Sequence, residues 1–165
     1  MRVIIVGCGR VGSTLARMLS EEGHDVTVVD QTSDAFRRLG AKFKGTRLVG
    51  PGTDVAVLTR AGIEQADVFV SVTDGDNRNI MAAQIAKTVF NVPRVLTRIY
   101  DPSRAAAYRE LGIQTICTTM IAANLIYDGA HDRPIDSLLT DLHEPRVQKP
   151  KAITAAGHPA GAQAH

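Results

Sequence analysis

The chain has 165 residues, of which 44% are hydrophobic and 22% charged, with a formal net charge of +2. This length suits one domain with a substantial core, and the composition is typical of a globular protein rather than a disordered or membrane-spanning one. No apolar run approaches the roughly 20 residues of a transmembrane helix, and the N-terminus looks like a core strand rather than a secretory signal, so we expect a cytoplasmic protein. Because the charge is near neutral and Lys and Arg are spread along the chain, nucleic acid is not an expected partner.

Strand-like and helix-like segments alternate along most of the chain. Strands are expected at 2–6, 25–29, 47–49, 67–72, 94–99 and 114–117. Helices are expected at 10–22, 33–39, 54–61, 77–90, 102–111 and 120–128. The first helix has apolar residues at helical spacing, namely Val11, Leu15, Met18 and Leu19. Since each parallel crossover needs a helix, the pattern predicts an α/β fold: a Rossmann-like, doubly wound, six-stranded parallel sheet with helices on both faces.

The end of the chain has a different composition. Prolines interrupt it at Pro134, Pro145, Pro150 and Pro159. Residues 152–165 are rich in Ala and Gly, and only 135–142 has the pattern of a short strand or helical turn. We therefore expect a dinucleotide-binding domain over 1–130 and a short extension over 131–165 that is mostly a flexible tail.

The two cysteines, Cys8 and Cys117, belong to no CxxC pair. Neither a zinc site nor a disulfide framework is indicated by this pattern, and no metal ligand is predicted. Both residues are expected to be small buried side chains.

A glycine-rich turn, GCGRVG, joins the first strand to the first helix. In such a turn Gly7 allows a tight bend, Gly9 lets the backbone approach a pyrophosphate, and Gly12 lets the helix pack closely on the strand. The helix start would present free N–H groups and a positive dipole end to the phosphates. Arg10 is either a phosphate ligand or a solvated residue at the helix start.

An acid, Asp30, lies 18 residues beyond Gly12 at the end of the second expected strand. It is placed to accept hydrogen bonds from the adenosine ribose hydroxyls. A carboxylate there would repel a 2′-phosphate and Gln31 supplies no cation, so NAD or an adenine nucleotide is favoured over NADP. The alternative is that the glycines serve only packing and Asp30 is a surface turn residue.

Three further loops follow expected strands at the edge where open α/β sheets bind ligands. The third strand leads into GPGTD, where Thr53 or Asp54 is suited to cap the next helix. The fourth leads into the polar turn TDGDNRN, which begins at Thr73 and Asp74. The fifth carries Arg98, where a basic side chain can meet a phosphate or a carboxylate.

Several of these motifs together resemble the regulator-of-potassium-conductance (RCK) N-terminal domain, also called the KTN or TrkA-N domain. They occur in order over 1–128 as GCGRVG, Asp30, GPGTDVAVLTRAGIEQAD, TDGDNRN and VLTRIYDP. Together with the positions of these loops after the expected strands, the resemblance implies a set of cofactor-binding residues. They are Gly7, Cys8, Gly9, Arg10, Val11, Gly12, Asp30, Gln31, Gly52, Thr53, Thr73, Asp74 and Arg98. Many members have an acid or Asn where this chain has Pro51, which removes a backbone donor and a side-chain contact.

The resemblance also implies a function. Such domains occur in cytoplasmic NAD-binding subunits of Trk-type potassium uptake systems, on the inner face of the membrane. Their ligand, NAD(H) or ATP/ADP, is an effector that changes the shape of an oligomer, which acts on a potassium-translocating membrane subunit of Trk or Ktr type. A homodimer or larger ring is expected. Members usually carry a C-terminal ligand domain for which too few residues follow Asp128, so a short form, a fragment and a chain with a separate partner remain alternatives.

Two other functions compete with this one. A small NAD-dependent dehydrogenase would need an acid or base beside the nicotinamide and a substrate pocket. The sequence has no YxxxK pair, HExxH motif or GxSxG elbow, so no catalytic residue is predicted. A Rossmann module that has lost its ligand is disfavoured by the intact fingerprint.

Overall fold

The structure, a computed structural model, describes residues 1–131, and its strands form a single parallel sheet. The strands are β1 (Arg2–Val6), β2 (Asp25–Asp30), β3 (Thr46–Val49), β4 (Val68–Ser71), β5 (Arg94–Ile99) and β6 (Gln114–Cys117). Their order is β3-β2-β1-β4-β5-β6, and every neighbouring pair is parallel. This order confirms the predicted doubly wound, Rossmann-like sheet, and the winding changes direction between β1 and β4.

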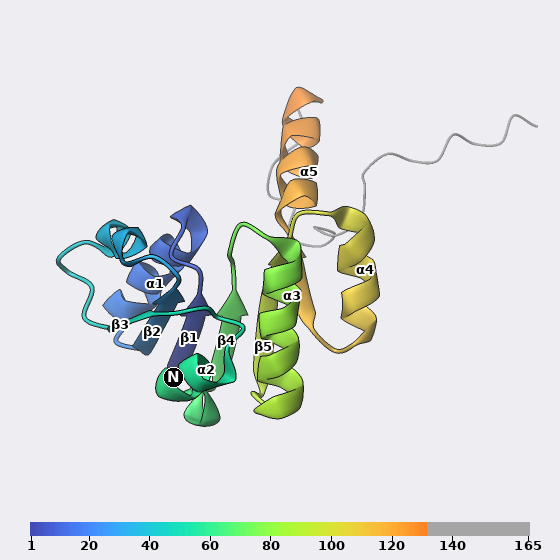
Figure 1. Cartoon of the computed structure of the whole chain (residues 1–165). Coiled ribbons are helices and arrows are strands. Elements are labelled where there is room, and N and C mark those ends of the chain that lie inside the picture. The colour runs from blue at the N-terminus through green and yellow to red at the C-terminus, as the bar shows by residue number, and fades with distance from the viewer. Residues whose placement is uncertain (132–165) are drawn as a thin grey trace, which may run out of the picture.

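Helices connect the strands in the predicted places (Figure 1). They are α1 (Arg10–Glu21), η1 (Ser33–Leu39), α2 (Val55–Arg60), η2 (Ile63–Gln65), α3 (Asp76–Gln84), η3 (Ile85–Val89), α4 (Pro102–Glu110) and α5 (Thr118–Ala130). The short η1 and η2 are 3₁₀ helices, and η3 is a π-helical turn that ends α3. The 3₁₀ helix η1 is followed by Gly40, whose positive φ of 70° is a conformation that glycine adopts readily.

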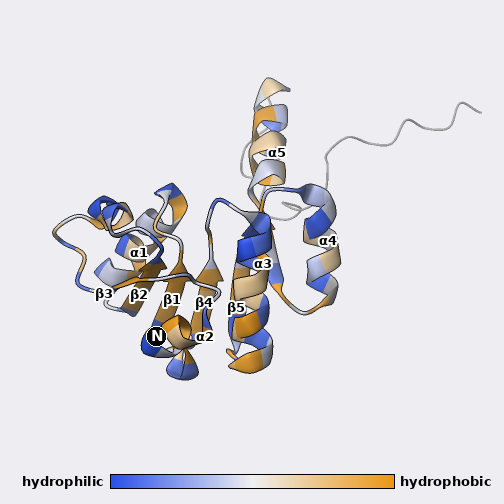
Figure 2. Cartoon of the chain, viewed as in Figure 1, coloured by the Kyte–Doolittle hydropathy of each residue, from blue (hydrophilic) through white to orange (hydrophobic). Residues whose placement is uncertain are grey.

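The sheet is buried on both faces because alternate residues of its central strands point to opposite layers. On β1, Val3 and Ile5 belong to a cluster with residues of α1 and η1, whereas Ile4 and Val6 pack with α2 and α3. Phe69 on β4 is completely buried. Figure 2 shows the central strands as hydrophobic ribbons between helices of mixed polarity. Because all six strands are parallel, their carboxyl ends lie together at one edge of the sheet.

Of the four apolar residues at helical spacing on α1, only Leu15 and Leu19 pack against the core. Val11 is 43% and Met18 55% exposed, although both match the helical spacing of apolar residues. The helix instead buries small residues, Gly12, Ser13 and Ala16. Small residues bring α1 close to the sheet, so its larger apolar side chains lie at the margin of the contact.

The helix α5 continues from β6 and projects beyond the carboxyl edge of the sheet (Figure 1). It begins and ends two residues outside the predicted bounds of 120–128. No helix among residues 1–131 is long and apolar enough to cross a membrane. Cys8 and Cys117 are both buried and unpaired, which confirms their prediction as buried side chains. The predicted tail, including 135–142, lies outside the described residues.

Candidate functional site

Loops at the carboxyl ends of β1 to β5 surround a cleft of about 620 Å³. Open α/β sheets bind ligands at this edge, beside the point where the winding reverses. Of the thirteen residues predicted to bind a cofactor, all but two line the cleft. The exceptions are Val11, which is exposed on α1, and Gly12, which is buried beneath the loop.

The three glycines of the first loop have different structural reasons to lack a side chain. Gly7 has a φ of 105°, and a Cβ there would lie 2.9 Å from the backbone nitrogen of Thr73. A Cβ at Gly12 would lie 1.9 Å from the carbonyl oxygen of Gly7. A Cβ at Gly9, by contrast, would have no protein atom within 4 Å. Packing therefore accounts for Gly7 and Gly12, whereas the space beside Gly9 is open at the cleft.

The first turn of α1 begins at this open position. Gly9 is the N-cap and supplies no side-chain hydrogen bond, and the first turn contains no acidic residue. The first N–H groups of the helix therefore have no capping side chain, and they add to the positive end of the helix dipole. Arg10, the first residue of α1, is exposed and lines the cleft. These features suit the binding of an anion such as a phosphate.

Asp30 joins the end of β2 to the glycine loop. Its Oδ2 accepts a hydrogen bond from the backbone N–H of Cys8 at 2.7 Å. Its Oδ1 accepts bonds from the backbone N–H and the hydroxyl of Thr32, both at 3.0 Å. A carboxylate has about four acceptor positions and three are used here, so Asp30 retains capacity for about one further hydrogen bond, such as one from a ribose hydroxyl. Its role in holding the loop is an addition to the role predicted from the sequence.

The thiol of Cys8 lies below the loop and is fully buried. Its Sγ donates to the carbonyl oxygen of Ala35 at 3.4 Å. Burial, and secondarily the negative charge of Asp30, raise the pKa of Cys8 to about 11. The side chain is therefore a protonated thiol at neutral pH and has little nucleophilic character.

The cleft carries an excess of positive charge. Four arginines line it, Arg10, Arg38, Arg78 and Arg98, against two acids, Asp30 and Asp74. Arg78 forms an ion pair with Asp74. Arg98 donates from Nη2 to the carbonyl oxygen of Thr73 at 2.6 Å, and its guanidinium lies 4.5 Å from the centre of the Tyr100 ring. Among the described residues, its buried Nε has no hydrogen-bond partner. The charge distribution favours an anionic ligand.

A buried amide, that of Asn79, supports this part of the cleft. Its Oδ1 accepts from both the backbone N–H and the hydroxyl of Thr73 at 2.7 Å. Its Nδ2 donates to the carbonyl oxygens of Thr73 and Arg98 at 3.0 Å. The sequence placed Asn79 in a polar turn without assigning it a role. Only the fold shows that one side chain connects the ends of β4 and β5.

The loop after β3 is shaped by packing and capping. A Cβ at Gly52 would lie 2.1 Å from Cγ1 of Val6, so this position has no space for a side chain. Asp54 accepts from the backbone N–H groups of Ala56 and Val57 at 2.8 and 3.3 Å and so caps α2. Of the two predicted capping candidates, Asp54 performs this role and Thr53 lines the cleft.

Several cleft residues were not predicted as ligand contacts. They include Thr32, Ala35, Arg38, Arg78 and Tyr100. The sequence contained a signal for two of them: Arg78 lies four residues after Asp74, a spacing that suits an ion pair, and Tyr100 lies two residues after Arg98 at the end of the fifth strand. Arg38 had none, because its place depends on how η1 packs.

The cleft offers few groups for acid–base or metal chemistry. Its lining, in the part of the chain that the structure describes, includes no histidine or lysine. No group of three or more His, Cys, Asp or Glu residues among 1–131 could hold a metal ion.

Comparison with known proteins links this site to a family. The sequence profile of the TrkA-N domain matches residues 3–119. A Trk system potassium uptake protein TrkA from Streptomyces coelicolor is 49% identical over 124 residues, which are 75% of this chain and 56% of that protein. A homologue from Methanothermobacter thermautotrophicus is 33% identical over 116 residues, 70% of this chain and 53% of that one. The chain thus spans about half the length of these relatives.

Solved structures share the fold at lower sequence identity. A Shewanella denitrificans Kef CTD in AMP bound form has a TM-score of 0.70 at 22% identity and covers 80% of each chain. A GsuK channel bound to NAD has a TM-score of 0.60 at 20% identity, over 70% of this chain and 21% of that one. A structure of GsuK bound to ADP has a TM-score of 0.66 at 19% identity, over 77% of this chain and 33% of that one.

Proposed function

Since this chain belongs to the TrkA-N domain family, we propose that it is the nucleotide-binding regulatory part of a Trk- or Ktr-type potassium uptake system. The observation that carries the proposal is the cleft itself. It combines an open position at Gly9, an uncapped helix start and an excess of arginine. These features suit the phosphates of a nucleotide.

The proposed ligand is NAD(H) or an adenine nucleotide such as ATP or ADP. Asp30 would accept hydrogen bonds from the ribose hydroxyls, and the glycine loop with Arg10 would bind the adjacent phosphates. The carboxylate of Asp30 disfavours the 2′-phosphate of NADP. Beyond the glycine loop, Thr73, Asp74 and Arg98 would contact the remainder of the ligand. Support comes from structural neighbours that were solved bound to AMP, NAD and ADP.

The proposed output is mechanical. A homodimer or larger ring of this chain would bind at the cytoplasmic face of a potassium-translocating membrane subunit. Ligand binding would favour one ring conformation over another and so change transport. The ligand can shift this equilibrium only by the difference between its affinities for the two conformations.

Isothermal titration of the full chain with NAD, NADH, ATP, ADP and NADP tests the ligand part of the proposal. Light scattering on the same sample tests the oligomer. We expect binding of at least one of the first four ligands, weaker binding of NADP and no turnover. A monomer that binds none of them refutes the proposal.

The variant Asp30→Asn tests the site with the least damage to the loop. Asn retains one acceptor oxygen for the Cys8 N–H, but it loses the charge, and its amide NH2 group replaces the oxygen that accepts from Thr32. We expect about tenfold weaker nucleotide binding from the loss of hydrogen bonds to a charged group. Unchanged affinity, with the fold intact, would remove Asp30 from the site.

A further inference from the structure

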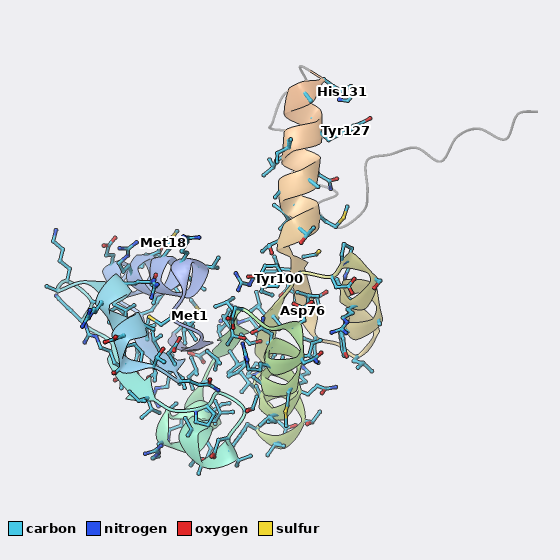
Figure 3. The ribbon with its side chains drawn as sticks, turned by 45° about the horizontal axis from the view of Figure 1, so that its top comes forward. Met1, Met18, Asp76, Tyr100, Tyr127 and His131 are labelled. Carbon is cyan, nitrogen blue, oxygen red and sulfur yellow. The ribbon has the colours of Figure 1, made fainter. Side chains whose placement is uncertain are left out.

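The first turn of α3 reaches both residues of a stacked pair at the end of β5. Asn79 Nδ2 donates to the carbonyl oxygen of Arg98 at 3.0 Å. The two carboxylate oxygens of Asp76 accept from the backbone N–H groups of Tyr100 at 2.9 Å and Asp101 at 3.1 Å. Figure 3 shows Asp76 and Tyr100 close together near the foot of α5. One helical turn thus holds the backbone on both sides of the Arg98–Tyr100 stack.

Asn79 also bonds the residue that the Arg98 guanidinium contacts. That guanidinium donates to the carbonyl oxygen of Thr73, and Asn79 bonds the same carbonyl as well as the N–H and hydroxyl of Thr73. The side chain therefore fixes Arg98 through its own carbonyl and through the group that its guanidinium contacts. Asn79 is fully buried and does not line the cleft, so it has no surface for a ligand.

We propose that Asn79 and Asp76 are positioning residues that orient Arg98 and Tyr100 toward the phosphate-bearing part of the nucleotide. The inference rests on the proposed nucleotide-binding function. Arg98 is held from one side by the Thr73 carbonyl and from another by the Tyr100 ring, and its Nε has no partner among the described residues. Arg98 lines the cleft, so guanidinium N–H groups that are not bonded to Thr73 can reach an anion there. Holding the side chain in advance removes the entropy cost of ordering it on binding.

The variant Asn79→Asp tests this inference because it keeps the shape of the side chain but removes the two donated hydrogen bonds. It also places a negative charge against the carbonyl oxygens of Thr73 and Arg98. We expect ADP and NAD to bind about tenfold more weakly, the loss typical of hydrogen bonds to charged groups. Adenosine, which has no phosphate, should bind as it does to the wild type.

A double-mutant cycle with Arg98→Ala separates positioning from general damage. If Asn79 acts through Arg98, adding Asn79→Asp to Arg98→Ala should cause no further loss of ADP affinity. Additive losses, or equal weakening of adenosine and ADP, would overturn the inference while leaving the proposed function standing. A wild-type chain that binds no nucleotide would refute both.

The control variant is Thr115→Val, which removes another buried hydroxyl. Thr115 bonds the carbonyl oxygen of Ala105 and the side chain of Arg109, and neither residue lines the cleft. We expect a similar loss of thermal stability with unchanged ADP affinity. If Asn79→Asp does not fold, Asp76→Asn serves in the same measurements. It should weaken ADP binding at least about threefold, since a charge-assisted hydrogen bond from a backbone N–H to the Asp76 carboxylate is lost, and unchanged affinity would overturn the inference.

Discussion

The structure separates the glycines of the first loop into positions set by packing and one left open for a ligand, and alanine substitution tests this separation. A Cβ at Gly12 would lie 1.9 Å from the carbonyl oxygen of Gly7. This is roughly 1.5 Å shorter than ordinary van der Waals contact. A Cβ at Gly9 would meet no protein atom within 4 Å, and its φ of −71° is open to any residue. The two variants should therefore fail in different ways.

The expected change in the free energy of unfolding of each variant is the sum of opposing contributions. For Gly12→Ala, overpacking costs up to about 3 kcal/mol, and more if the backbone cannot move, while replacing Gly inside a helix returns about 1 kcal/mol. We expect a net loss of about 2 kcal/mol or more, which lowers the Tm by about 8 °C in a domain of this size. For Gly9→Ala, the loss of a preferred N-cap residue costs less than about 1 kcal/mol, or at most about 4 °C.

Thermal unfolding followed by circular dichroism measures both variants. Gly129→Ala is a suitable control, since Gly129 lies on α5 with no atom within 4 Å of an added Cβ. Titration with NAD and ADP then compares Gly9→Ala with the bulkier Gly9→Val, for which pyrophosphate binding should be lost. A Gly12→Ala protein as stable as the wild type would refute the packing argument. Retained nucleotide affinity in Gly9→Val would show that the loop does not approach the phosphates.

Three further predictions concern the thiol, a helix cap and the core. Because burial raises the pKa of Cys8 to about 11 from 9.0, the unfolded chain releases this proton first, so stability should fall between those pH values. The decline should be smaller in Cys8→Ala when urea unfolding is followed across this range, and an equal decline would contradict the assignment. Asp54→Ala should cost about 1 kcal/mol through loss of the α2 cap, measured by urea unfolding, whereas no change would mean that water replaces the cap. Phe69→Ala should cost about 3 to 5 kcal/mol by the same method, and a loss below about 1 kcal/mol would show that the surrounding core collapses into the space.

Local patterns identified the strands well because each buried strand is a short apolar run bounded by turn residues. Strands β1, β5 and β6 have the predicted bounds, and the other strands differ by one residue at one or both ends. The type of each helix was harder to predict from the sequence. The change from α3 to a π-helical turn at Ile85–Val89 has no marker in the apolar spacing, since the same residues also fit a continuous α-helix.

Spacing alone did not specify how far each apolar residue of α1 is buried. Val11 and Met18 match the apolar period of α1, but they are largely exposed because the contact with the sheet runs through Gly12 and Ala16. Periodicity reports which residues share a face, whereas the distance between helix and sheet decides how far that face is covered. That distance depends on the small residues, which carry little weight in a hydrophobic pattern.

By itself, the sequence determined the alternation of strands and helices, the glycine turn and the acid at the end of β2, because each is encoded by neighbouring residues. Tertiary structure alone decided that Asn79 connects Thr73 to Arg98, that Asp30 holds the Cys8 N–H, and that Arg38 faces the same cleft as Arg98. These contacts join residues distant in the chain. Their partners depend on the order of the strands and on the packing of each loop, which no local pattern specifies.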